Sequence, residues 1–188
     1  MADYTAWGPL APLIGEWEGE SGLDVSFHNA EGETGDTKFL EKISMKPFGP
    51  VDNGAQHLYG LDYRMAAWRQ GEEDPFHTEV GYWLWDAASK QVMRCFMVPR
   101  GSTVLAGGTA EANDTSFSLE ANRGDTTYGI LSNKYLDEFA RTTRYDATIT
   151  IEGDTFRYDE TTTVEHSKST DLILHTDRNT LRRVSLEA

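Results

Sequence analysis

The stretch Leu13-Ile14-Gly15-Glu16-Trp17-Glu18-Gly19-Glu20 is the segment of this 188-residue chain that decides its fold class. Read with the two-residue period of a strand, Gly15, Trp17 and Gly19 share one face, and the three glutamates share the other. Glycines beside a buried tryptophan let neighbouring backbone and bulky groups approach closely. The pattern predicts a half-buried strand in a sheet that bends tightly around an interior, as a small antiparallel barrel begins.

Composition limits the class of protein. The chain carries 17 Lys and Arg against 31 Asp and Glu, and its net charge of -14 repels phosphate backbones, so we expect no nucleic-acid partner. It has no run of the roughly 20 apolar residues that a membrane helix needs and no signal-peptide pattern at its start, which predicts a cytoplasmic protein without membrane attachment. The single cysteine, Cys95, is expected to pack as a small buried hydrophobe.

The chain is organised as one domain over residues 1–188, because no linker, charge block or long-period repeat divides it. Aromatic and β-branched runs bounded by Gly, Asp or Asn predict about ten strands. We place them at residues 13–20, 37–45, 57–68, 76–86, 91–98, 102–109, 115–121, 137–151, 155–164 and 180–186.

The connections between these runs favour hairpins. Turn residues lie at 86–89, 99–101, 113–114 and 152–154, each between runs that can pair antiparallel. Helical periodicity is confined to a short N-terminal segment, Tyr4 to Pro12, which could close one end of a barrel, and a turn near 133–137. An up-and-down barrel and a sandwich both fit, and we favour the barrel because closure removes unpaired edges. A barrel of about ten strands is wide enough to hold a ligand.

Three segments are similar, in order and spacing, to motifs of one family. The first is the opening stretch at 13–20. The second is His77-Thr-Glu-Val-Gly-Tyr-Trp83, followed by Val98-Pro-Arg-Gly101 and Gly107-Gly108. The third is Leu174-His175, ahead of Leu181-Arg-Arg-Val184. Together they resemble the nitrobindins, haem-binding β-barrels related in shape to lipocalins and fatty-acid-binding proteins.

The resemblance implies a cofactor and an activity. His175 stands where the family places its haem-ligating histidine, so the resemblance implies haem b held by His175 as the metal ligand. It further implies an open coordination site for NO, or isomerisation of peroxynitrite to nitrate, and it allows a homodimer. No residue of this chain is assigned a catalytic role beyond iron ligation.

The position of His175 in the barrel has two readings. His175, Asp177, Asn179 and Leu181 share parity, so a strand that starts at His175 would turn a polar face inward, which is a poor wall for a porphyrin. A strand that begins near Thr180 leaves the histidine on the preceding turn, where it approaches the cavity from the rim. We favour the second reading, and a purely structural His175 stays open beside it.

Other candidate residues divide between two functions. His28 lies where the family's distal segment would be and could hydrogen-bond or ligate, although an exposed loop residue is the favoured reading. His77 and Glu79 share a strand face and are expected to form a structural pair. The alternative to haem is a haem-free carrier of a small hydrophobic or fatty-acid-like ligand. In that alternative Trp17, Trp83, Met93 and Met97 line the cavity.

Overall fold

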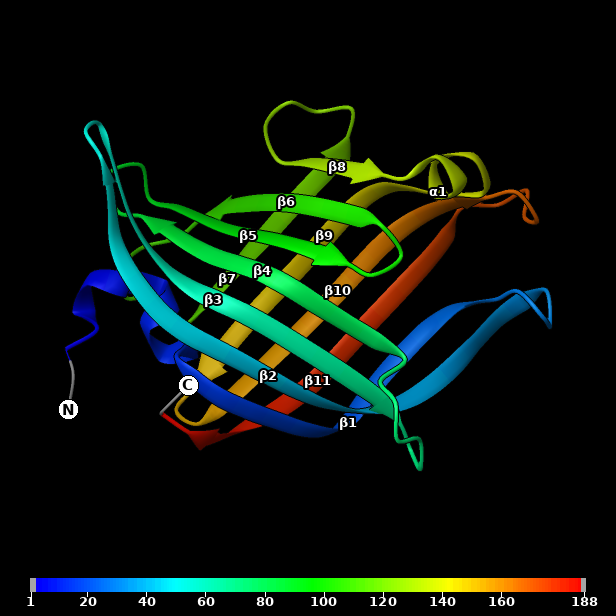
Figure 1. Cartoon of the computed structure of the whole chain (residues 1–188), viewed down its shortest axis with the longest axis horizontal. Helices are drawn as coiled ribbons and strands as arrows, with labels where there is room; N and C mark the ends of the chain where they lie inside the picture. Colours follow the sequence, from blue (N-terminus) through cyan, green and yellow to red (C-terminus); the bar gives the residue numbers. More distant parts are fainter. Residues whose placement is uncertain (1–2, 187–188) are drawn as a thin grey trace.

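The computed structural model describes residues 3–186, and these form a closed barrel of eleven strands (Figure 1). The ring runs β1-β11-β10-β9-β7-β8-β6-β5-β4-β3-β2 and closes by pairing of β2 with β1. In chain order the elements are the 3-10 helix η1 (Thr5–Leu13), β1 (Gly15–His28), β2 (Glu33–Asn53), β3 (Gln56–Arg69), β4 (His77–Asp86), β5 (Gln91–Val98), β6 (Ser102–Thr109), β7 (Ser116–Arg123), β8 (Gly129–Ser132), α1 (Lys134–Phe139), β9 (Ala140–Glu152), β10 (Thr155–His166) and β11 (Ile173–Ser185).

The predicted barrel is confirmed, with one correction to its topology. Each of the ten expected strands is present, and the additional strand is β8. β6 and β7 pair at Gly107 and Glu120, and β8 lies between them further along, where it pairs antiparallel with β6 and parallel with β7. The expectation of a purely antiparallel barrel was therefore wrong at this point, because the loop after β7 returns the chain in the same direction.

The opening stretch folds as predicted. Trp17 is fully buried, while Glu18 and Glu20 on the opposite face are exposed. A Cβ on Gly19 would lie 2.6 Å from the side-chain nitrogen of Asn179, and Gly15 adopts a φ of +125° that disfavours any other residue. The glycines thus allow the close approach of β1 and β11 beside the tryptophan.

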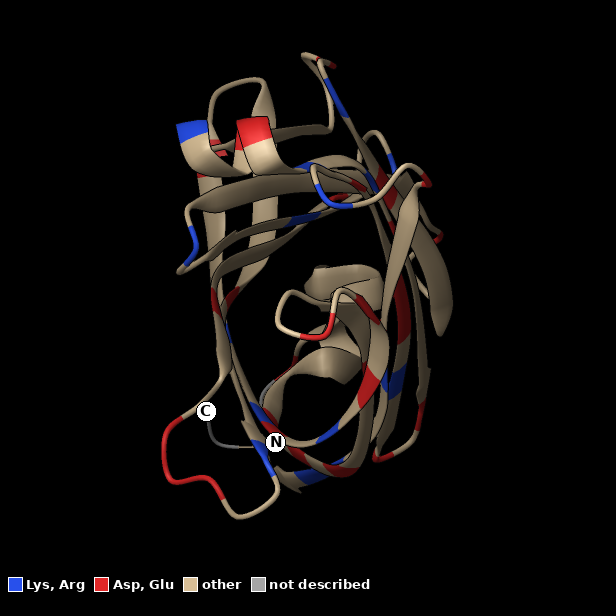
Figure 2. Ribbon diagram, turned by 90° about the vertical axis from the view of Figure 1, so that its right-hand side faces the viewer, with Lys and Arg blue, Asp and Glu red and all other residues tan. Residues whose placement is uncertain are grey.

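The N-terminal segment closes one end of the barrel, as the sequence predicted. Leu10 and Leu13 of η1 are completely buried, and the indole nitrogen of Trp7 donates a hydrogen bond of 3.0 Å to the carbonyl oxygen of Gly60 in β3. Figure 2 looks along the barrel, where the coil of η1 falls within the outline of the ring of strands, and Figure 1 places it at the end where β1 begins. The helix is therefore an internal plug and part of the core.

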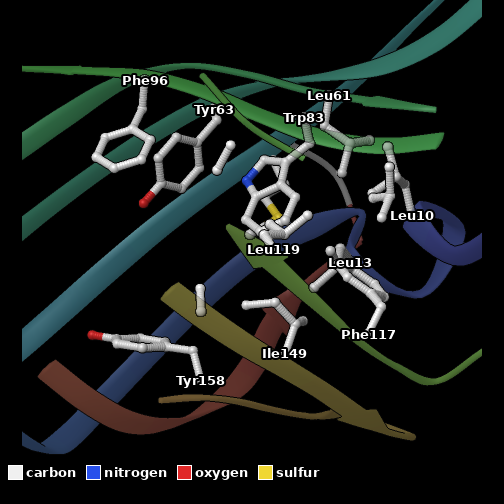
Figure 3. Packing of buried hydrophobic residues seen from close by; sticks show 14 of the residues in the cluster. Leu10, Leu13, Leu61, Tyr63, Trp83, Phe96, Phe117, Leu119, Ile149 and Tyr158 are labelled. Carbon is white, nitrogen blue, oxygen red and sulfur yellow. The ribbon is translucent and has the colours of Figure 1, made fainter. Parts of the chain in front are cut away.

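The barrel interior has an apolar half and a polar half. Next to the plug, the apolar half packs Trp17, Leu61, Trp83, Phe117, Ile149 and Leu181, all buried. In Figure 3 the hydroxyl groups of Tyr63 and Tyr158 point away from Leu10 and Leu13, toward the polar half. No helix within residues 3–186 combines the length and apolar character needed to cross a membrane.

Strand β11 begins earlier than predicted. It pairs with β10 from Ile173 onward, opposite Val164, and Thr176 pairs with Val25 of β1. His175 therefore lies within the strand, and the prediction that placed it on a turn before Thr180 was wrong. Its polar neighbours looked like a loop in the sequence, whereas they face a polar cavity.

Candidate functional site

A cavity of about 70 Å³ lies in the polar half of the barrel. Phe39, Met65, Phe76 and Phe156 provide apolar wall. Five carboxyl side chains of the described residues also line it, namely Asp24, Glu41, Glu79, Glu160 and Asp177, together with three basic ones, His77, Arg94 and His175.

Arg94 is the central cation of the cavity. Its guanidinium contacts Glu160 and lies 2.6 Å from Glu79, and it also donates hydrogen bonds to the hydroxyls of Tyr63 (2.8 Å) and Tyr145 (2.5 Å). The residue is 3% exposed, so one buried positive charge serves two buried carboxylates.

The two carboxylates beside Arg94 differ in their acidity. Burial raises the pKa of Glu79, but Arg94 and His77 outweigh it and bring that pKa to about 2. For Glu160 burial dominates over Arg94 and raises the pKa to about 7. Arg94 therefore stabilises the anionic form of Glu79 more strongly than that of Glu160.

Glu41 of β2 is buried with neutral partners. The hydroxyl of Tyr158 and the side-chain nitrogen of Asn179 each donate a hydrogen bond of 2.8 Å to Glu41 Oε2. Burial outweighs these two bonds and raises the pKa of Glu41 to about 8. The carboxyl is therefore mostly protonated at neutral pH, and no ion pair with Glu41 occurs within the described part of the chain.

His175 lies on the inner face of β11 between two aspartates. Its Nε2 is 3.0 Å from Asp177 Oδ2 and 3.4 Å from Asp24 Oδ2. Neither oxygen lies along an N–H direction, so Nε2 makes no aligned hydrogen bond although the atom is buried. Burial opposes the charged imidazole, but the contacts with Asp177 and Asp24 prevail and raise the pKa to about 10. His175 is therefore an imidazolium at neutral pH.

His77 and Glu79 form the structural pair that their spacing indicated. His77 Nε2 lies 3.3 Å from Glu79 Oε1, and burial only partly offsets the carboxylate, so the pKa of His77 is raised. His57, which would have had to complete a metal site with them, is exposed and lies 3.7 Å from Asp52 instead.

The residues predicted for the site lie in different places. Trp83 lines the cavity, whereas Trp17 packs against Phe156 in the apolar half, with its indole nitrogen 2.8 Å from the carbonyl oxygen of Leu13.

Met93 and Met97 do not line the cavity, because the inward face of β5 carries Val92, Arg94 and Phe96, and Met97 is 52% exposed.

His28 lies near the end of β1, outside the cavity wall. It packs against Gly35, where a Cβ would meet the imidazole at 2.8 Å. Cys95 is only partly buried, where the sequence predicted a buried residue, and this partial burial raises the pKa of its thiol to about 11.

Sequence reasoning missed the charged residues that dominate the cavity, which are Glu41, Arg94, Glu160 and Asp24. One signal was available for Arg94: in the run 91–98 it alternates with Val92 and Phe96, opposite in parity to the methionines. The positive charge of Arg94 argued against predicting that its face of the strand points into the barrel.

A closed barrel with one end plugged and a cavity at the other has the architecture of the β-barrels that hold small ligands. A model of the THAP4-like, heme-binding beta-barrel domain matches residues 6–183, and the chain belongs to that family. The resemblance inferred from the sequence is thereby confirmed. Among solved structures, Rv2717c from M. tuberculosis shares the fold, with a TM-score of 0.64 and 21% identity over 93% of this chain and 94% of that one. A search of curated proteins found no match.

The surroundings of His175 do not fit a haem-iron ligand in this arrangement. Iron binds a neutral imidazole through a free lone pair, whereas Asp177 and Asp24 raise the pKa of His175 and favour its protonated form. The buried Nε2 is also flanked by carboxylate oxygens at 3.0 and 3.4 Å, in the space that a porphyrin would need around its axial ligand. Ligation would require loss of the proton and movement of both aspartates.

Proposed function

We propose that this barrel is a haem-free binding protein for a small organic cation with an apolar part. One observation carries the proposal: five carboxyl groups line the cavity against three basic side chains, and Glu41 is the carboxyl without a basic partner among the described residues. Arg94 faces two carboxylates, His175 faces two more, and Glu41 has hydrogen-bond partners but no cation. A buried carboxyl in this position remains protonated until a cation replaces the proton.

The wall around Glu41 suits a ligand of this kind. Glu41 and Tyr158 line the same cavity as Phe39, Met65 and Phe76. Aromatic side chains attract cations through their ring faces, and they also bury apolar groups. A primary ammonium group could therefore meet the Glu41 carboxylate while a hydrocarbon or aromatic group contacts the phenylalanines.

The charge balance favours this ligand over a fatty-acid-like one. An anionic headgroup would need a free cation in the cavity, and both terminal nitrogens of Arg94 are already bound to carboxylates and tyrosine hydroxyls. A carboxylate ligand that binds Arg94 through these two nitrogens would have to displace Glu79 or Glu160 from a buried ion pair, which costs several kcal/mol.

A second candidate function is haem binding at His175, with NO binding or peroxynitrite isomerisation as the activity. It is favoured by membership in the heme-binding family and by the inner-face position of His175 on β11. Bound haem would supply an open iron site for the small molecule. The chain's own part would be to release the His175 proton and withdraw Asp24 and Asp177.

Calorimetric titration with three matched probes tests the first function. Benzylamine, benzyl alcohol and benzoate share a ring and differ in charge. We expect saturable binding of benzylamine and at least roughly tenfold weaker binding of the other two. The replacement Glu41→Gln keeps the hydrogen bonds from Tyr158 and Asn179 and should weaken benzylamine binding by about tenfold or more. The exposed control Glu18→Gln should leave benzylamine binding unchanged. Tighter binding of benzoate, or a Soret band with hemin that His175→Ala removes, would favour the other ligand classes.

A further inference from the structure

We propose that Asp24, His175 and Asp177 form a binding site for one divalent first-row transition-metal cation on the β1–β11 wall of the cavity. This site is separate from the Glu41 carboxyl and does not depend on the organic-cation function proposed above. The metal ion would lie at His175, the residue to which the family resemblance assigns haem iron.

The backbone register brings the three side chains together. Asp24 of β1 and Asp177 of β11 are direct cross-strand partners, and His175 precedes Asp177 by two residues on the same inward face. One ligand atom from each residue lies within 4.8 Å of the other two. Because both strands are held by neighbours on each side, these three side chains start from a rigid frame.

The distances match those between ligands of one small cation. Zinc binds imidazole nitrogen and carboxylate oxygen at about 2.1 Å, so ligand atoms are about 3.0 Å apart at right angles and about 3.4 Å apart at tetrahedral angles. His175 Nε2 lies 3.0 Å from Asp177 Oδ2 and 3.4 Å from Asp24 Oδ2. These two separations match those of ligand atoms on one ion, and the carboxylate oxygens of Asp24 and Asp177 lie within 4.8 Å of each other.

Unpartnered buried atoms provide a second, independent indication. His175 Nε2 and Asp24 Oδ1 are both buried and have no hydrogen-bond partner, and Asp24 as a residue is 8% exposed. Buried polar atoms are nearly always satisfied, and an unsatisfied one costs about 1–3 kcal/mol. A cation bound at Nε2 would satisfy the His175 atom, and a cation held by both carboxylate oxygens of Asp24 would also satisfy Oδ1.

The donor set indicates the class of ion. One imidazole and two carboxylates suit Zn²⁺, Mn²⁺ or Fe²⁺ rather than Ca²⁺, which takes oxygen ligands. Binding of the ion at Nε2 would displace the proton that His175 carries in the metal-free protein, and three protein ligands leave at least one position of the ion open. All three residues line the cavity, so an open position would be accessible to a small molecule inside it.

Titration of chelator-treated, full-length protein tests the site. Zn²⁺ is followed by calorimetry and Co²⁺ by its visible absorption, which reports the coordination geometry. We expect one saturable equivalent, with binding weakened about tenfold or more in Asp24→Asn and in His175→Gln. The matched control is His57→Gln, which removes an exposed histidine 3.7 Å from Asp52 and should leave binding unchanged.

Two further variants keep the outcome decisive. Asp177→Glu retains a carboxylate and should bind Co²⁺ with a shifted spectrum, and Glu41→Gln should bind Zn²⁺ as the unmodified protein does while losing benzylamine. Circular dichroism and thermal melts establish that each variant is folded. No binding at millimolar Zn²⁺, or equal binding by unmodified protein, Asp24→Asn and His175→Gln, would overturn the site.

Discussion

Asp177 of β11 lies directly opposite Glu160 of β10 on the inner face of the barrel. Asp24 of β1 lies opposite Asp177 on its other side, so three carboxyl groups form one row across three strands. Like charges in facing positions destabilise a sheet, and here Arg94 and His175 compensate them. The stability of the barrel and the chemistry of its cavity therefore depend on the same ion pairs.

Removal of the Arg94 charge should strongly destabilise the fold. Arg94→Met leaves Glu79 and Glu160 buried without a cation, and we expect the free energy of unfolding to fall by about 3–5 kcal/mol. Urea denaturation at pH 7 measures this change. The control Arg157→Met breaks an exposed pair with Glu152 and should change stability by no more than about 0.5 kcal/mol. Similar losses for both variants would contradict the central role of Arg94.

The stability of the protein should fall as pH rises because of Glu41. Its pKa is raised from 4.5 to about 8 in the folded state, so its stabilising contribution is complete below pH 4.5 and is lost as pH rises through 8. Glu41→Gln removes this loss. Thermal melts from pH 5 to pH 9 should show the free energy of unfolding of the variant rising, relative to that of the unmodified protein, by up to roughly 4 kcal/mol. A difference in stability between the two proteins that stays constant across this pH range would contradict the raised pKa of Glu41.

Haem coordination should require removal of the two aspartates. At pH 7 we expect hemin to produce no His175-dependent Soret shift with the unmodified protein, because the imidazole is protonated and Nε2 is flanked by carboxylates. Asp24→Asn/Asp177→Asn removes both charges and lowers the pKa of His175 toward its usual value. The double variant should bind hemin with a Soret shift that additional His175→Gln abolishes. A shift already present in the unmodified protein would instead support the haem function.

The N-terminal plug should behave as core. Leu13→Ala opens a cavity at a completely buried position and should cost about 2–5 kcal/mol of unfolding free energy. Leu131→Ala changes a side chain that is 74% exposed, and we expect it to alter stability by less than about 0.5 kcal/mol. Denaturant unfolding of the two variants compares them directly. Equal effects would mean that η1 contributes little to the fold.

Much of the barrel could be predicted because its strands alternate in the ordinary way. The Trp17 strand, the runs at 91–98 and 102–109, and the hairpin at 152–154 all fold as the pattern indicated. Strand β8 is four residues long and carries too few positions for a period to show. The early start of β11 was hidden because its inward residues are polar.

The candidate site was harder to predict for one physical reason. Sequence patterns assign apolar residues to the inside, and Met93 and Met97 were therefore placed on the inward face. In the barrel the inward face of β5 carries Arg94 instead. Charged residues can face inward only when partners from other strands satisfy them, and those partners lie 15 or more positions away, as Glu79 does from Arg94. A single strand therefore carries no sign of them.

The most direct test of the proposed function is proton release when benzylamine binds. Calorimetry at pH 7 in two buffers of different ionisation enthalpy measures the number of protons exchanged. If a cation replaces the Glu41 proton, the unmodified protein should release about one proton per ligand, and Glu41→Gln should release almost none. Binding of benzylamine without proton release, or with equal release from both proteins, would contradict the account.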